Sequence, residues 1–256
     1  HLASKVEIFD HGRRYRFTLR PNIRFHDGRP LTSSDVRYTL NQVISRKGPS
    51  RLLRYELADL KAIRTPSKRA VDVLLHKTNH LLLSVLAEVP ILPAHYYTRR
   101  SLRSIKLNWL PVGTGPFAVE TRDGKGTLVM RRNDSYWGLK PKLKYIIFRS
   151  IPKPAKALSM LRNNELEVLS NVYLGYYPTV LSKEGVKKRF KLMRLHPYRM
   201  RLMIFNTKRG PLKDRKVRLA MVRLADRQRM VRTIRKGMGR LLSAPLWPLS
   251  PWYNKT

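Results

Sequence analysis

The sequence predicts a mixed α/β fold, in which sheets are flanked by helices. Three observations support this class. Short segments that alternate apolar and polar residues, as half-buried strands do, are interspersed with segments whose apolar residues recur at helical spacing. Glycine and proline clusters separate these segments. Hydrophobic residues make up 42% of the 256 residues, which is ordinary for a globular protein and sufficient for a sizeable core.

The first elements are a β-hairpin and a capped helix. Residues 5–9 and 15–19 alternate apolar and polar side chains around a turn at residues 10–12. Thr32 and Asp35 then form a capping-box pattern, and the acidic side chain suits the positive end of the helix dipole. Apolar side chains follow at helical spacing at Val36, Leu40, Val43 and Ile44. A Gly-Pro pair is expected to stop this helix.

Further strands and short helices lead to a strong break. Strands are expected at residues 57–63 and 70–75, and short helices at residues 80–87 and 93–100. The sequence Pro-Val-Gly-Thr-Gly-Pro at residues 111–116 is rich in residues that interrupt regular structure, so a segment boundary is placed there.

Strands and helices alternate again beyond this break. A hairpin is expected from residues 117–121 and 127–132 across a glycine-containing turn, and a strand at residues 145–149. The remaining expected elements are a helix at 155–161, strands at 167–169, 191–195 and 200–205, and two helices at 214–225 and 226–236, each opened by an aspartate.

The charge of the chain is unusual. Its 54 lysine and arginine residues against 16 aspartate and glutamate residues give a formal net charge of +38 at pH 7. Such an excess attracts polyanions, whether nucleic acid, anionic lipid or acidic protein. The basic residues are spread over segments that also carry regular apolar patterning. Nonspecific binding of polyanions is therefore expected, whereas a specific nucleic-acid site is not favoured.

Several kinds of site are excluded or disfavoured. The absence of cysteine excludes disulfides, thiolate metal sites and cysteine catalysis. No apolar run approaches the roughly 18 residues that span a bilayer. His76 and His80 have a spacing that could share a metal on one helix, but the pattern places them at a strand end and a helix start. His26 is expected to make a structural hydrogen bond, and Gly113-Thr-Gly115 to form a backbone turn rather than a phosphate cradle. No catalytic residue, metal site or cofactor is predicted.

Five blocks of sequence carry a further inference. They begin with Phe17-Thr-Leu-Arg20, Phe25-His-Asp-Gly28 and Asp35-Val36 as the first block, and continue with Val112-Gly-Thr-Gly-Pro-Phe117, Arg132-Asn-Asp-Ser-Tyr-Trp-Gly138, Phe148-Arg-Ser-Ile-Pro152 and Phe205-Asn-Thr207. In this order they resemble the family 5 extracellular solute-binding proteins, which are the peptide-, dipeptide- and nickel-binding receptors of bacterial ABC importers.

The resemblance implies a type II periplasmic-binding-protein-like fold with two lobes. Family members are longer than this chain, which also begins at His1 rather than Met, so the chain is expected to be a fragment of the receptor. Residues 1–112 would form a first lobe segment. Residues 113–197 would form a second segment after the Gly-Thr-Gly-Pro crossing, and residues 198–256 the start of the next lobe.

The resemblance also implies a non-enzymatic receptor that closes two lobes around a solute and docks on an ABC permease. A peptide is the favoured solute, and nickel complexes or other small solutes stay open. The implied location is periplasmic or extracellular, and a lipid anchor on the full-length form is compatible with it. The candidate ligand-binding residues are a strand-end group and a terminal-loop group, namely Phe205, Asn206, Thr207, Trp247, Trp252 and Tyr253.

One alternative function stays open because of the charge. Family members usually carry acidic or neutral residues at many solvent-facing positions that are lysine or arginine here. Such a one-signed surface is found in engineered supercharged proteins and in proteins adapted to polyanionic surroundings. The alternative is an interaction protein, natural or engineered, that uses a solute-binding scaffold to bind nucleic acid or another anionic surface.

Overall fold

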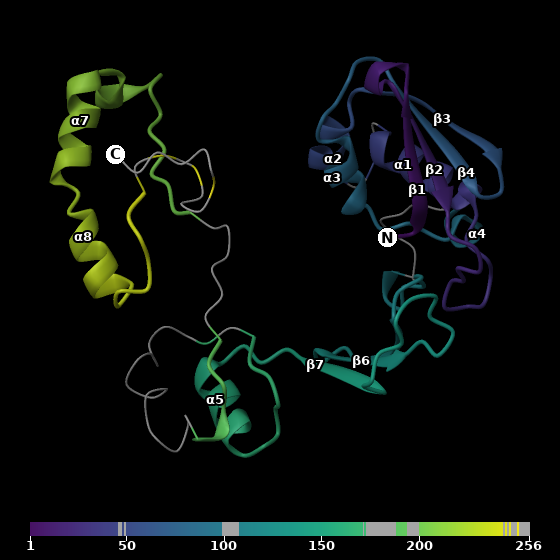
Figure 1. The fold of residues 1–256 in the computed structure, drawn as a ribbon. Coiled ribbons are helices and arrows are strands. Elements are labelled where there is room, and N and C mark those ends of the chain that lie inside the picture. Colours follow the sequence, from purple (N-terminus) through teal and green to yellow (C-terminus); the bar gives the residue numbers. More distant parts are fainter. Residues whose placement is uncertain are drawn as a thin grey trace. The chain divides into compact units, whose positions relative to one another are not determined.

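The structure is a computed structural model that describes residues 1–45, 48, 50–98, 108–170, 172, 188–193, 200–242, 244, 246 and 250. The chain divides into two compact units, which are His1–Ile151 (unit 1) and Pro152–Thr256 (unit 2) (Figure 1). The division into three segments at residues 112 and 197 remains a prediction.

Unit 1 begins with a four-stranded antiparallel sheet. Its strands are β1 (Ala3–Phe9), β2 (Arg14–Leu19), β3 (Leu60–Ser67) and β4 (Ala70–Leu75), in the spatial order β1-β2-β4-β3. The hairpin expected at residues 5–19 is present, with Ile8 opposite Tyr15 and Glu7 opposite Arg16. Because side chains alternate along a strand, Val71, Val73 and Leu75 enter the core while Asp72 lies on the other face.

Helices cover the apolar face of this sheet. Helix α1 (Ser33–Ile44) packs against β3 and β4, and its Leu40 and Val43 are buried in the core. Three shorter helices follow, α2 (Arg51–Glu56), α3 (Leu82–Ala87) and α4 (Ala94–Tyr97). The expected helices at 80–87 and 93–100 are thus confirmed in shortened form. Helix α2 was not predicted, and the strand expected from residue 57 begins only at Leu60, because Leu57 is the C-cap of α2.

The start of α1 is fixed by the carboxylate of Asp35. Its Oδ2 accepts hydrogen bonds from the Thr32 backbone N–H and the Thr32 hydroxyl, each at 2.9 Å, as the capping pattern predicts. Its Oδ1 accepts a further bond of 2.9 Å from the backbone N–H of Ala94. One turn later, the hydroxyl of Thr39 donates to Asp35 O and accepts from the backbone N–H of Leu92 at 2.9 Å. Two buried polar side chains of α1 therefore hold the segment that leads into α4.

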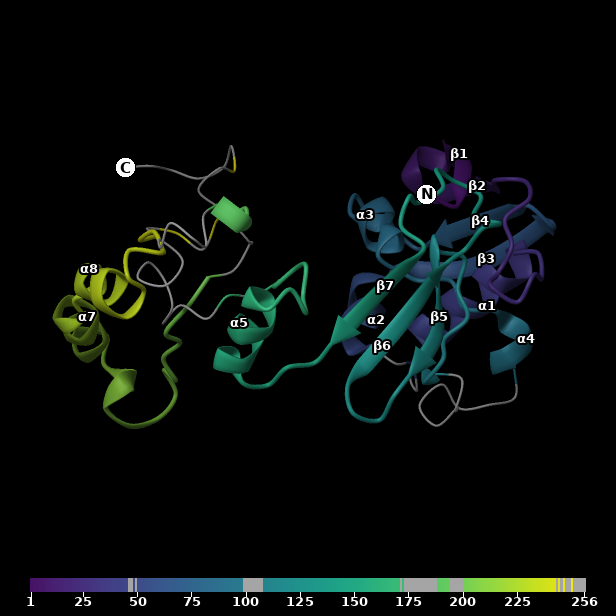
Figure 2. The ribbon, with the colours of Figure 1, turned by 90° about the horizontal axis from the view of Figure 1, so that it is seen from below.

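A second, three-stranded antiparallel sheet completes unit 1. It contains β5 (Phe117–Arg122), β6 (Thr127–Arg132) and β7 (Tyr145–Arg149) in sequential order (Figure 2). The hairpin and the strand predicted here are confirmed, and the bounds of β6 and β7 agree with the prediction residue for residue. No residue of the three strands is buried.

The described regular elements of unit 2 are all helical. Helix α5 (Pro154–Arg162) buries Ala157, Leu158, Met160 and Leu161. A 3-10 turn, η4 (Gly210–Lys213), leads into α7 (Arg215–Leu224), which is followed by α8 (Arg227–Arg229) and a π-helical turn, η5 (Met230–Ile234). Asp214 and Asp226 cap α7 and α8, because their Oδ1 atoms accept from Lys216 N and Arg229 N, both at 2.7 Å. Both predicted helices are therefore confirmed.

Two predicted strands of unit 2 are wrong. Residues 167–169 and 200–205 are irregular, as are residues 191–193 of a third predicted strand, whose remaining residues lie outside the described ones. The alternating side chains of residues 200–205 fit a strand, but a strand also needs a neighbour for its backbone groups. No such neighbour is present among the described residues. No described helix is long and apolar enough to cross a membrane.

Candidate functional site

Three of the five sequence blocks meet around His26. Its backbone N–H donates to Gly113 O at 2.8 Å, and its ring Nδ1 accepts from the backbone N–H of Gly113 at 3.2 Å. The other ring nitrogen, Nε2, lies 3.0 Å from Gly115 O. Because Nδ1 is an acceptor, Nε2 carries the proton and donates it to this carbonyl. Both ring nitrogens are therefore used structurally, as expected for His26, and Gly113-Thr-Gly115 is a backbone turn rather than a phosphate cradle.

The third block, residues 132–138, contacts the same backbone turn. Asn133 Nδ2 donates to Gly115 O at 3.2 Å, and Trp137 Nε1 donates to Thr114 O at 3.1 Å. The Trp137 ring packs against the buried core of the four-stranded sheet, and the guanidinium carbon of Arg20 lies 5.7 Å from its centroid. The motifs thus tie the two sheets of unit 1 to each other. We call this cluster the His26 junction, and it consists of Arg20, His26, Gly113, Thr114, Gly115, Asn133 and Trp137.

Asp27, beside His26, fastens the same turn to α4. Its Oδ2 lies 2.8 Å from His95 Nε2, and its Oδ1 accepts from the backbone N–H of Arg29 at 3.0 Å. Burial alone would raise the pKa of Asp27, but the hydrogen bonds from Arg29, His95 and Tyr96 outweigh it and lower the pKa. The carboxylate is therefore held in its charged form as a structural acceptor. An aspartate beside a histidine can form a catalytic dyad, but here the Asp27–His95 pair connects the turn at Asp27 to α4.

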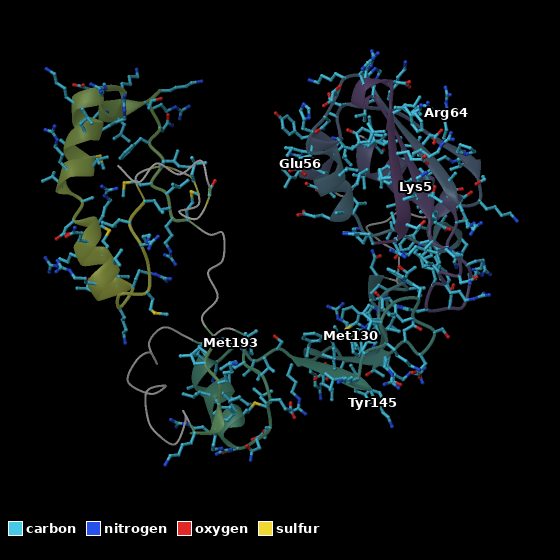
Figure 3. All side chains as sticks on the ribbon, viewed as in Figure 1. Lys5, Glu56, Arg64, Met130, Tyr145 and Met193 are labelled. Atoms are coloured by element: carbon cyan, nitrogen blue, oxygen red, sulfur yellow. The ribbon has the colours of Figure 1, made fainter. Side chains whose placement is uncertain are left out.

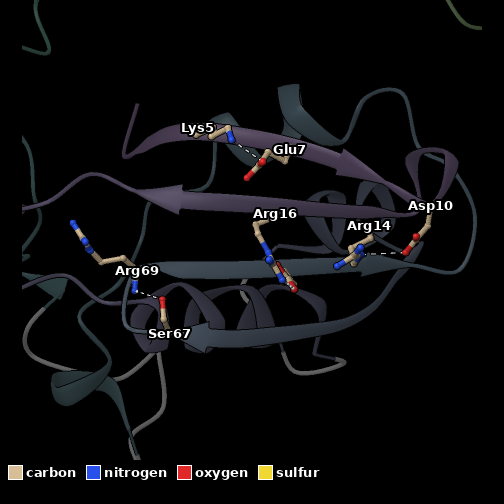
Figure 4. Close-up of polar contacts among 8 residues, drawn as sticks. Lys5, Glu7, Asp10, Arg14, Arg16, Ser67 and Arg69 are labelled. Carbon is tan, nitrogen blue, oxygen red and sulfur yellow. Dashed lines mark hydrogen bonds and ion pairs between the residues drawn. The ribbon is translucent and has the colours of Figure 1, made fainter.

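Charged side chains form a row across the outer face of the four-stranded sheet. Glu7, Arg16, Asp72 and Arg64 lie opposite one another on β1, β2, β4 and β3. Arg16 makes two hydrogen bonds of 2.7 Å to the two carboxylate oxygens of Asp72. Figure 4 labels Arg16 on β2 and Glu7 on the neighbouring strand β1. The bond from Arg16 lowers the pKa of Asp72 and outweighs burial, which acts in the opposite direction. Opposite charges that face each other across strands stabilise the sheet.

Replacing Asp72 by asparagine is expected to reduce the free energy of unfolding at neutral pH by about 1.5–3 kcal/mol, the contribution of a hydrogen bond to a charged group. Because the pKa of Asp72 is lowered in the folded state, its contribution is present above the unfolded-state pKa and is lost as the pH falls through the folded-state pKa. The free energies of unfolding of wild type and Asp72→Asn, measured by urea denaturation, should therefore converge in acid. Glu120→Gln is the control, because the Glu120–Arg131 pair is solvent-exposed, lies on the other sheet and should contribute at most about 1 kcal/mol.

The predicted ligand-binding residues fall into two groups. Phe205 is half-buried and Asn206 and Thr207 are exposed, in the irregular segment before η4 rather than at the end of a strand. Asn206 Oδ1 accepts from Lys208 N at 3.1 Å, which makes a local turn. Trp247, Trp252 and Tyr253 lie outside the described residues. A ligand-binding role for the six residues remains a prediction.

The histidine pair behaves as predicted. His76 follows the last residue of β4, and His80 precedes α3, so the two do not share a helix. In the described part of the chain, no group of three or more histidine, aspartate or glutamate side chains could hold a metal ion.

Comparison with known sequences identifies the family. The family model for bacterial extracellular solute-binding proteins, family 5 Middle, matches residues 1–256. Protein XP55 of Streptomyces lividans is 29% identical over 255 residues, which cover 99% of this chain and 45% of that protein. The oligopeptide-binding protein AppA of Bacillus subtilis (strain 168) is 27% identical over 261 residues, which cover 99% of this chain and 47% of AppA.

Comparison with solved structures supports the same assignment. The structure of Bacillus subtilis AppA in complex with a nonapeptide matches with a TM-score of 0.80 and 25% identity, covering 100% of this chain and 51% of that one. NikZ from Campylobacter jejuni in complex with Ni(L-His) matches with a TM-score of 0.85 over 96% of this chain and 48% of NikZ, and at 23% identity this likeness concerns the fold alone. The fold is that of the type II periplasmic-binding-protein-like receptors, as expected. The chain spans about half the length of the relatives it matches, and it belongs to family 5 of the bacterial extracellular solute-binding proteins.

Proposed function

We propose that the chain is part of a receptor that binds a peptide outside the cytoplasmic membrane and delivers it to an ABC permease. The observation that carries this proposal is the match of AppA, a protein solved with a nonapeptide, over 100% of this chain. The family description and the name of the oligopeptide-binding relative support the same class of solute. The proposed location is periplasmic or extracellular, with a lipid anchor on a longer form of the protein.

The proposed mechanism requires binding and closure without catalysis. Two lobes close around an extended peptide, and the closed form docks on the permease. The segment Phe205-Asn206-Thr207 and the aromatic residues Trp247, Trp252 and Tyr253 are proposed to contact the ligand. The engagement of both His26 ring nitrogens supports a non-enzymatic role for that residue.

Titration calorimetry with a pool of nonapeptides tests this function. At 150 mM salt the chain is expected to bind members of the pool, and chromatography of the mixture should recover the peptides uncleaved. Full-length Bacillus subtilis AppA is the positive control. If AppA binds and this chain does not, the affinity comes from residues outside the chain. If the peptides are cleaved, and cleavage is lost on changing one histidine, the non-enzymatic proposal is wrong.

The second candidate function is polyanion binding, and it is favoured by the contacts that the carboxylates make within the protein. Among the described residues, Asp72, Asp134 and Glu120 pair with basic side chains, and Asp214 and Asp226 cap helices. These five acidic groups are thus engaged within the protein, and most of the described basic side chains are exposed.

Heparin affinity measured against salt concentration distinguishes this second function. Binding should weaken steeply as salt rises, because each neutralised anionic group releases counterions. Binding of an uncharged peptide should respond little to salt. A chain that passes through heparin resin at low salt would rule out the polyanion function.

A further inference from the structure

The turn at residues 25–29 is bonded to two different segments by neighbouring side chains. His26 contacts Gly113, which lies just before the second sheet, and Asp27 contacts His95 of α4. Histidine is the side chain whose charge ordinarily changes between about pH 5 and 8. The turn thus carries two contacts that the gain of a proton can change.

The contact between His26 and Gly113 requires a neutral imidazole ring. The two residues exchange two hydrogen bonds, from His26 N–H to Gly113 O at 2.8 Å and from Gly113 N–H to the ring Nδ1 at 3.2 Å. A second proton on the ring would occupy the lone pair of Nδ1 and set one N–H group against another. Nε2 would keep its bond of 3.0 Å to Gly115 O, because it is a donor in both charge states. Acid therefore breaks one bond of the junction and leaves the others.

The contact between Asp27 and His95 responds to a proton in the opposite direction. Oδ2 of Asp27 lies 2.8 Å from Nε2 of His95, and the two side chains are only 15% and 23% exposed. Burial would raise the pKa of Asp27, but the hydrogen bonds to its carboxylate lower it, so this group stays charged. A positive charge on His95 would then face a negative one, and charge-assisted hydrogen bonds are about twice as strong as neutral ones. Acid therefore strengthens the contact between the turn and α4.

Other charged side chains lie on the segments that meet at the turn, but only Asp27 bonds to either ring. Within the described part of the chain, the hydrogen bonds of the two rings go to Gly113, Gly115 and Asp27. Arginine and aspartate side chains ordinarily keep their charge between about pH 5 and 8. The two histidines are thus the groups that respond in this range. The other charged residues of these segments are Arg20, Arg24, Arg29, Asp35, Arg132 and Asp134.

We propose that the His26 junction is a pH-sensitive joint between the two sheets of unit 1. As the pH falls from about 7.5 to 5, Gly113 is released from the His26 ring and the second sheet gains freedom, while α4 stays attached to the turn. The second sheet follows Gly113 along the chain, and Figure 3 labels Met130 of β6 and Tyr145 of β7 in it. The remaining bonds of His26 keep the two sheets joined. This inference does not rest on the proposed peptide-binding function.

Hydrogen exchange of the full chain, measured by NMR between about pH 7.5 and 5, tests the joint. The protection factor, which corrects for the pH dependence of exchange itself, should fall about 2–10-fold at Gly113, the effect of one lost hydrogen bond. It should not fall at Arg132 N–H, which donates to Lys144 O within the second sheet, or at Thr98 N–H, which donates to Ala94 O in α4.

The nitrogen chemical shifts of the histidine rings identify the group responsible. His26 should be neutral at the higher pH, with its proton on Nε2, and doubly protonated at the lower pH. The fall in protection at Gly113 should follow the titration of His26. It should not follow that of His80, which is exposed.

Two variants separate the two contacts of the turn. His26→Gln cannot gain a proton in this range, and its amide can offer both an acceptor and a donor, so the fall at Gly113 should disappear. His95→Gln keeps a donor for Asp27 without a charge, so the fall at Gly113 should persist. His80→Gln is the matched control and should behave as wild type. Circular dichroism shows whether each variant is folded, and the titration of the wild-type chain is decisive even if one is not.

Three outcomes would overturn the inference. Equal loss of protection at Gly113, Arg132 and Thr98 would indicate general unfolding in acid. Protection at Gly113 that stays constant while His26 gains its second proton, or that still falls in His26→Gln, would show that the ring does not control this bond. A His26 ring that remains neutral down to about pH 5 would remove the response from the range in which histidine ordinarily titrates. None of these outcomes decides whether the chain binds peptides.

Discussion

Replacing His26 by alanine is expected to lower the free energy of unfolding of unit 1 by about 2–3 kcal/mol. The ring joins two segments that lie far apart in the sequence, through Nδ1 to Gly113 N and through Nε2 to Gly115 O. Alanine leaves the N–H of Gly113 without its acceptor, and an unpaired, part-buried backbone group carries most of the cost. The carbonyl of Gly115 keeps its bond from Asn133, so its loss is smaller.

Urea denaturation followed by tryptophan fluorescence measures this effect, because Trp137 belongs to the same junction. His80→Ala is the matched control, since His80 is exposed and the structure assigns no hydrogen bond to it. His26→Gln can present both an acceptor and a donor, so its stability should lie between those of wild type and His26→Ala. Equal denaturation midpoints for His26→Ala and His80→Ala would show that the junction contributes nothing to stability.

The parts of the fold that could be predicted are those encoded locally. The capping pattern of Thr32 and Asp35 identifies the start of α1, and short apolar runs identify β6 and β7, because each signal lies within a few neighbouring residues. The structural role of His26 could be anticipated from its place in a turn. Its partners could not be derived from periodicity, since they lie 87 and 89 residues further along the chain.

The parts that could not be predicted depend on a neighbouring segment of structure. Residues 200–205 alternate as a strand does, but the described residues provide no neighbouring strand, and the segment is irregular. Helix α7 carries the apolar residues Met221 and Leu224 at helical spacing, but they are 41% and 84% exposed. Periodicity shows which face favours burial and does not show what buries it.

Replacing Asp35 by alanine is expected to have the largest effect, a loss of about 3–4 kcal/mol, because the side chain serves two elements at once. Asp35 is only 6% exposed, and its two oxygens accept from Thr32 N, the Thr32 hydroxyl and Ala94 N. Alanine therefore removes the cap of α1 and also leaves the Ala94 N–H unpaired at the entry to α4. Both losses fall within one packed core, where water cannot easily replace the missing acceptor.

Hydrogen exchange distinguishes this double role from a simple cap. In Asp35→Ala the amides of Thr32 and Ala94 should both exchange faster, although 62 positions separate them in the sequence. Glu88→Ala, which removes an exposed carboxylate at the end of α3, is the control and should change neither amide nor the denaturation midpoint. If only Thr32 responded, the bond from Ala94 would not contribute in solution, and the anchoring of α4 would have to come from Thr39, whose hydroxyl accepts the Leu92 N–H, and from the Asp27–His95 pair.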